Sequence, residues 1–210
     1  MFDHIKKLYM GKAIGSSKVI SAFNSGWIIE SQVDEILSLK VDYTLEEAVK
    51  FKKEECSYLC RLAIADGVDV ELSSGSVEHF SLSDDDQRNL NAKMMNVVAG
   101  ITELEYHSDG EVCKYYSAED MAQICAAAQQ KITIETTYNN CLYQWIKGCK
   151  TIEEVSAIKY GVDIPEEYWS EPWRRIKEQI DNALKLKSQE HDSDKQQEDS
   201  LREGLETESK

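Results

Sequence analysis

The sequence predicts an α+β fold that is rich in helix: an N-terminal helical hairpin, then two β-hairpin–helix units with a long helix, and a disordered acidic C-terminal tail. Apolar residues recur at helical spacing before residue 66 and again over 118–147. Between these stretches the pattern alternates with a period of two on both sides of two polar glycine turns. From residue 188 the chain is polar and charged, so it cannot bury enough apolar area to fold.

Five segments are predicted from these changes of pattern. Residues 1–40 form a compact helical hairpin, and 41–65 form a connecting amphipathic helix. Residues 66–168 form the domain of β-hairpins and helices. A further amphipathic helix occupies 169–187, and 188–210 are the disordered tail.

Capping residues predict where helices of the first two segments begin and end. Ser31, with Asp34 three residues later, is placed to start the last helix of the N-terminal hairpin. Gly26 suits the C-terminus of the preceding helix. Thr44 and Glu47 form a capping box at the start of the connecting helix.

Two hairpin–helix units are predicted after Gly67. Val68, Val70 and Leu72 alternate along a first strand, which the turn "SSGS" joins to the strand "VEHFSL". The same order of strand, turn and strand follows around the turn "SDG". Each hairpin leads into a helix, the first capped by Ser83 and the second by Ser117.

The two helices of these units differ in length. The first is expected to bury a stripe of Leu90, Met94, Val97 and Val98. The second keeps its apolar stripe over 118–147, which is roughly 45 Å at ~1.5 Å per residue. The β-branched patch "ITIETT" leaves open whether this helix is continuous.

Composition limits the classes of partner. The net charge is −15 and the pI is about 4.7, so nucleic acid and anionic membranes are not expected partners. Residues 1–65 carry no net charge, whereas residues 66–165 carry −10. No apolar run approaches the ~20 residues of a membrane helix, and the N-terminus has no signal-peptide pattern.

The cysteines are predicted to be reduced and mostly buried. The chain contains six of them but no CxxC pair. A zinc site would need cysteine and histidine at finger-like spacing, which the sequence lacks. Cysteine then serves as a small apolar residue, as in cytoplasmic proteins.

The stretch "VEHFSLSDDDQRNL" raises the question of a metal or acid–base site at His79 and the triplet Asp84, Asp85 and Asp86. A simpler interpretation is a helix start. Ser83 supplies the cap, and the aspartates lie in the first turn, where negative charge is favourable. Neighbouring helical residues also point about 100° apart, which is poor geometry for a shared ion. We therefore favour the structural interpretation.

Other patterns of catalytic chemistry are missing from the sequence. There is no GxGxxG, GxxxxGK[ST], GxSxG or HExxH motif. No catalytic, cofactor-binding or metal-binding residue is therefore predicted, and no cofactor. The aromatic residues Tyr115, Tyr116, Tyr138, Tyr143 and Trp145 occur at spacings typical of a core.

Three tryptophans are candidates for a partner interface. Trp169 and Trp173 precede the apolar positions of the last amphipathic helix, and Trp27 follows a glycine turn. Tryptophan is enriched at interface hot spots. The alternative, that Trp169 and Trp173 fold back on their own domain, is equally compatible with the sequence.

The N-terminal segment resembles the short XkdX-like proteins of phages and prophages of Gram-positive bacteria. The resemblance covers "MFDHIKKLYMGKAIGSSKVISAFNSGWIIESQVDEIL", with a departure at "YMGKAIGSS". The residues that carry it are Ile5, Lys6, Tyr9, Val19, Ala22, Gly26, Trp27, Ile28 and the helix "SQVDEI". Those proteins are encoded near the end of the tail module, beside fibre and lysis genes.

Residues 56–168 look like a domain of unknown function that is common in phage tail and tail-fibre-associated proteins. The resemblance is carried by "ADGVDVELSSGSVEHFSLSDDDQRNL", "YHSDGEVCKYYSAEDMAQI" and "TTYNNCLYQWIKGCKTIEEVSAIKYGVDIPEEY". The motifs are specific as an ordered set, although each alone is only a hairpin or a capped helix. Neither family brings catalytic residues with it.

These resemblances imply a non-enzymatic structural or interaction protein of a phage tail, at the baseplate or at fibre attachment. The alternative is a tail or tail-fibre assembly chaperone that is not retained in the virion. The expected partners are other tail, baseplate or fibre proteins, and a homo-oligomer is compatible. The expected location is the virion tail, or the host cytoplasm during assembly. An enzymatic role would require an acid–base pair in a cleft.

Overall fold

The computed structural model describes residues 1–185. They belong to two units, Met1–Tyr168 and the chain from Trp169 onward. In the second unit, residues 171–185 are helical, within the amphipathic helix predicted for 169–187. The predicted disordered tail, 188–210, lies outside the described residues.

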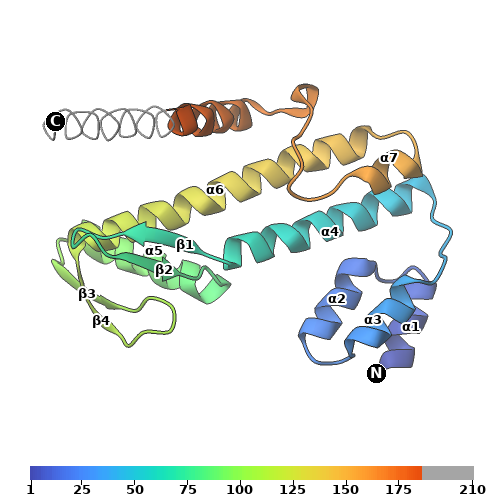
Figure 1. The fold of residues 1–210 in the computed structure, drawn as a ribbon, viewed down its shortest axis with the longest axis horizontal. Helices are drawn as coiled ribbons and strands as arrows, with labels where there is room; N and C mark the ends of the chain where they lie inside the picture. Colours follow the sequence, from blue (N-terminus) through green and yellow to red (C-terminus); the bar gives the residue numbers. More distant parts are fainter. Residues whose placement is uncertain (186–210) are drawn as a thin grey trace, which may run out of the picture. The chain divides into compact units, whose positions relative to one another are not determined.

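The first unit is helical except for two short hairpins (Figure 1). Its elements, in chain order, are α1 (Phe2–Met10), α2 (Ser16–Asn24), α3 (Glu30–Leu37), α4 (Leu45–Ala65), β1 (Val68–Glu71), β2 (Val77–Phe80), α5 (Asp84–Val98), β3 (Glu103–Tyr106), β4 (Lys114–Ser117), α6 (Ala118–Gly148), α7 (Ile152–Ala157) and the 3₁₀ turn η1 (Glu166–Tyr168).

The fold class is the predicted one. β1 pairs with β2 and β3 with β4, both antiparallel, as two separate two-stranded sheets. Val68 lies opposite Phe80 in the first hairpin, and Leu104 lies opposite Tyr116 in the second. Each hairpin is followed by a helix whose first turn is capped by a serine. The N-terminal segment holds three short helices, α1 to α3.

The long helix α6 is continuous through the β-branched patch. Its threonine hydroxyls bond back to its own turns: Thr133 donates to the carbonyl of Gln129 at 2.8 Å, and Thr136 to that of Ile132 at 2.6 Å. These two threonine hydroxyls are therefore satisfied without breaking the helix.

Helices α4 and α6 run antiparallel, side by side (Figure 1). The Cys60 thiol donates to the carbonyl of Glu135, and nearer the start of α4 the Tyr143 hydroxyl donates to the carbonyl of Lys53. The Ser57 hydroxyl also lies within hydrogen-bonding distance of the Tyr143 hydroxyl. These contacts hold together the two helices from which both hairpins extend.

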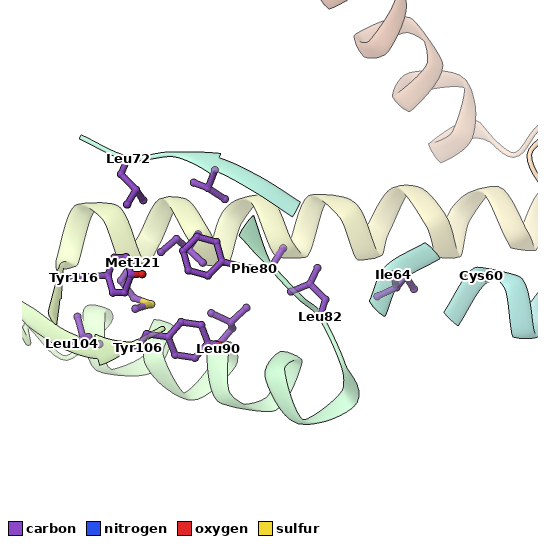
Figure 2. Close-up of a cluster of buried hydrophobic side chains, with 13 residues drawn as sticks. Cys60, Ile64, Leu72, Phe80, Leu82, Leu90, Leu104, Tyr106, Tyr116 and Met121 are labelled. Atoms are coloured by element: carbon purple, nitrogen blue, oxygen red, sulfur yellow. The ribbon is translucent and has the colours of Figure 1, made fainter. Parts of the chain in front are cut away.

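One core lies where the hairpins meet α5, α6 and the end of α4. Figure 2 shows its side chains converging between the helices and strands. Its buried members are Cys60, Ile64, Val70, Leu72, Phe80, Leu82, Leu90, Leu104, Tyr106, Tyr116, Met121, Ile124 and Ala128. A second core fills the N-terminal helices with Ile5, Tyr9, Val19, Ala22, Ile28 and Ile36.

Four sequence predictions of burial and capping need correction. On α5, Leu90 is buried, but Met94 and Val98 are 37% and 73% exposed because α5 packs mainly on α6, which covers only one side of it. Tyr115 is 73% exposed, since the register of β3 and β4 turns Tyr116 into the core instead. Helix α3 begins at Glu30, one residue before the predicted cap.

Candidate functional site

The histidine and aspartates of "VEHFSLSDDDQRNL" are separated in the structure. The Ser83 hydroxyl accepts from the N–H of Asp86 at 3.3 Å, and the Asp86 carboxylate accepts from the N–H of Ser83 at 3.0 Å. Asp85 pairs with Arg88 in the next turn. The aspartates thus begin α5, as predicted, and His79 has other partners.

His79 lies between two hydrogen-bond acceptors. Its Nδ1 is 2.7 Å from the Asp69 carboxylate, and its Nε2 is 2.7 Å from the carbonyl oxygen of Asp66. A neutral imidazole has only one N–H, so both contacts are satisfied together only by the imidazolium. The bonds to Asp69 and then to Asp66 accordingly raise the pKa of His79.

Asp109, in the turn of the second hairpin, closes the free edge of β2. Its N–H donates to the carbonyl of His79 at 2.9 Å. Its carboxylate accepts from both the N–H and the hydroxyl of Ser81 at 3.0 Å. Asp109 therefore occupies backbone groups that another strand would otherwise pair with.

Asp120 makes the reciprocal contact from the second unit to the turn of the first hairpin. Its carboxylate accepts from the N–H of Ser73 at 2.8 Å and from the Ser73 hydroxyl at 3.1 Å. It also accepts from the capping hydroxyl of Ser117 at 2.9 Å. These bonds, led by the one from the Ser73 backbone, lower the pKa of Asp120. The hairpin–helix units are thus clamped to each other at two aspartates.

Glu78 forms a third link between the hairpins. Its carboxylate accepts from the Lys114 ammonium at 2.5 Å and from the Tyr116 hydroxyl at 2.7 Å, and 14% of its side chain is exposed. Burial alone would raise the pKa of Glu78, but hydrogen bonds from Lys114, Tyr116 and Ser108 outweigh it and lower the pKa. The bond to Glu78 also raises the pKa of Lys114. Both groups are therefore held in their charged forms.

These residues border an open cleft of about 350 Å³ between the hairpins. It is lined by Val77, Glu78, His79, Ser108, Asp109, Glu111, Val112 and Lys114. Beside it, the Ser81 hydroxyl donates to the Asp109 carboxylate. The other oxygen of that carboxylate lies 4.0 Å from Nε2 of His79. A hydrolytic triad needs the histidine next to the serine. Here both imidazole nitrogens face other acceptors, so His79 does not activate Ser81.

The described part of the chain holds neither a cluster of metal-binding side chains nor a membrane-spanning helix. Within residues 1–185 no three acidic, cysteine or histidine side chains are grouped to hold an ion. None of the helices described there is both long enough and apolar enough to cross a membrane.

All six cysteines are free thiols. Burial raises the pKa of Cys56 to about 11, which keeps that thiol protonated. Cys60 and Cys141 are also buried, whereas Cys113, in the second hairpin, is exposed. The sequence pattern gave no reason to separate Cys113 from the others.

The tryptophans predicted for an interface differ in exposure. Trp27, in the turn between α2 and α3, is 59% exposed. Trp173 is only 7% exposed, which favours the alternative that it is buried within this chain, and its role in a partner interface stays a prediction. Trp169 is half-buried, with the Arg174 guanidinium 5.3 Å from its ring centroid. Trp27 belongs to the first unit, and Trp169 and Trp173 belong to the second.

Two apolar residues near Trp27 were missed by sequence reasoning. Phe23 and Ile29 are 40% and 63% exposed, although each falls in an apolar stretch that predicts burial. The available signal was the alternation of exposed and buried residues after the turn, where Ile28 is buried between Trp27 and Ile29. We call Phe23, Trp27 and Ile29 the turn surface.

Comparisons with known proteins identify no relative. No protein-family model matches the chain, and neither a curated protein nor a solved structure does. The resemblance to phage tail proteins therefore stays a prediction from the sequence.

Proposed function

We propose that this protein is a non-enzymatic structural and interaction protein of a phage tail, at the baseplate or at fibre attachment. The resemblance of residues 1–37 and 56–168 to tail-module proteins supports this class. The observation that carries the proposal is the turn surface, where three large apolar side chains are exposed within seven residues.

The backbone of the turn surface is fixed. Gly26, at φ 71°, ends α2 in the left-handed conformation. Its N–H donates to the carbonyl of Phe23 at 2.8 Å, and the N–H of Trp27 donates to that of Ala22 at 2.9 Å. This is the Schellman arrangement of a helix end. Because Ile28 is anchored in the core beside it, the backbone at Trp27 has little conformational entropy left to lose on binding.

The neighbouring helix indicates what kind of surface would receive Trp27. The sequence of α3, ESQVDEIL, holds three acidic residues and no basic one, and Glu30 and Asp34 are exposed. A complementary partner offers an apolar pocket for the indole with basic residues at its rim.

The clamped hairpins favour a scaffold role over a catalytic one. Glu78, His79, Asp109 and Asp120 are each engaged in contacts that join elements of this chain. Such pairs rigidify a fold. A rigid body that displays an apolar surface is suited to binding another protein.

Co-sedimentation with phage tails tests the proposal. Tails are taken from a strain in which this gene is deleted, and the purified chain is added back. The wild-type chain is expected to sediment with the tails. Trp27→Ser is expected to bind at least about 30-fold more weakly, the effect of losing a hot spot of about 2 kcal/mol.

Tyr115→Ser is the matched control, because it also removes an exposed aromatic ring but lies away from the turn surface. It is expected to sediment as the wild type does. Equal binding by Trp27→Ser and the wild type would mean that the turn surface does not bind the tail. Absence of any sedimentation of the added chain with intact tails would favour the assembly chaperone.

A further inference from the structure

A polar pocket of about 280 Å³ lies between α2 and α4, which pack side by side. From α2 it is lined by Ser17, Lys18 and Ser21. From α4 it is lined by Glu54, Arg61 and two residues between them. Neither the hairpin clamps nor the turn surface includes these side chains.

Ser17 is the unusual residue of this pocket. It is only 3% exposed, yet its hydroxyl makes no hydrogen bond to any group within residues 1–185. Its oxygen is not one of the fully buried polar atoms that lack a partner, so the hydroxyl is open to the pocket and free to donate. The hydroxyl borders the pocket, so a group bound there would satisfy it.

The charges beside Ser17 are also uncommitted. Lys18 and Arg61 form no salt bridge within the described residues, and neither does Glu54. Two cations and one carboxylate leave the pocket with a net charge of +1 in a chain whose net charge is −15. One negative charge balances this pocket, and a guanidinium presents paired donors that match a carboxylate.

We propose that the pocket between α2 and α4 binds a carboxylate, with Arg61 and Lys18 as its cationic partners and Ser17 as a hydroxyl donor. The group is either an acidic side chain or the C-terminal carboxylate of a protein partner. This inference deepens the proposed function, on which it rests, by naming a chemical group that the partner carries. Small carboxylates test the pocket with no partner present, so the two claims fail separately.

The experiment is an NMR titration of the full chain with sodium acetate, against sodium chloride at the same ionic strength. Saturable shifts are expected at the Arg61 side chain and at the amides of Ser17 and Ser21. For so small a ligand the dissociation constant is expected to be about 1–10 mM. Arg61→Gln and Lys18→Gln are each expected to weaken binding about tenfold or more.

Lys40→Gln is the control, because it removes one exposed positive charge outside the pocket. It is expected to bind acetate as the wild type does, and circular dichroism checks that each variant is folded. N-acetylglutamate amide presents only a side-chain carboxylate and N-acetylglycine only a terminal one. Tighter binding of either supports the proposal and identifies the source.

Two results would overturn the proposal. One is the absence of saturable shifts with all three carboxylates. The other is tighter binding of inorganic phosphate than of acetate through the same residues, which would assign the pocket to phosphate groups instead.

Discussion

At the scale of single residues, the polar side chains of the hairpins hold the fold together. His79 joins β2 to the end of α4 and to Asp69 on β1, and its own carbonyl receives Asp109 from the other hairpin. Sequence reasoning rejected the site with the aspartate triplet for a correct reason, the capping role of Ser83. The sequence could not identify Asp109 as a partner of His79, because the two are 30 residues apart and no local pattern predicts such a contact.

His79 predicts a pH dependence of stability. Because the folded pKa of His79 is raised, its stabilising contribution is complete below the ordinary histidine value of about 6.5 and is lost as pH rises through the folded pKa. The side chain is 43% exposed, so solvent screening limits the effect to about 1 kcal/mol or less.

Urea unfolding at pH 6 and pH 9 measures this dependence. Replacing His79 with Gln should lower the free energy of unfolding at pH 6 and have a smaller effect at pH 9. His4→Gln, which replaces an exposed imidazole on α1, should change neither value. If His79→Gln proves equally destabilising at both pH values, the charged imidazole does not hold the hairpin.

At the scale of elements, capping residues predicted helix starts well, and burial was predicted less well. Thr44 and Ser83 cap their helices as expected, because a cap is a local interaction. Exposure of Val98 and Tyr115 was not predictable, since it depends on how much of a helix or strand its neighbours cover. The sequence also left the continuity of α6 open, because intrinsic propensity does not describe the back-bonding of its threonines.

The junction between α4 and β1 predicts a strict requirement for Gly67. This residue has φ 91°, and a Cβ placed on it would lie 2.2 Å from the carbonyl oxygen of Phe80. Gly75, in the turn between β1 and β2, has φ 83° but nothing within 4 Å of such an atom. Both positions favour glycine, and only Gly67 also faces a close backbone.

Replacing each glycine with alanine separates the strain of the left-handed conformation from the close approach of the Phe80 backbone. Gly75→Ala should cost about 1–2 kcal/mol of stability, the strain of the left-handed conformation alone. Gly67→Ala should cost clearly more, because the strands of the first hairpin must also move apart. Urea unfolding followed by circular dichroism gives both values, and equal losses would mean that the close approach is not a constraint.

At the scale of the whole molecule, the acidic net charge and the clamped hairpins favour a chain that binds another protein. Residues 66–165 carry −10 of the net charge of −15, and several of their carboxylates serve as clamps. In the N-terminal helices Trp27 is exposed, and the Ser17 hydroxyl makes no hydrogen bond within residues 1–185. The two binding features therefore share α2, because the turn surface follows it and the pocket lies between it and α4.

Quantitative mass spectrometry of purified phage particles, from the strain that encodes this chain, distinguishes a tail component from an assembly factor. We expect peptides of this protein in intact particles, at a ratio to the tail-tube protein that is constant between preparations. Particles free of these peptides, with the chain abundant in the lysate, would contradict a tail component.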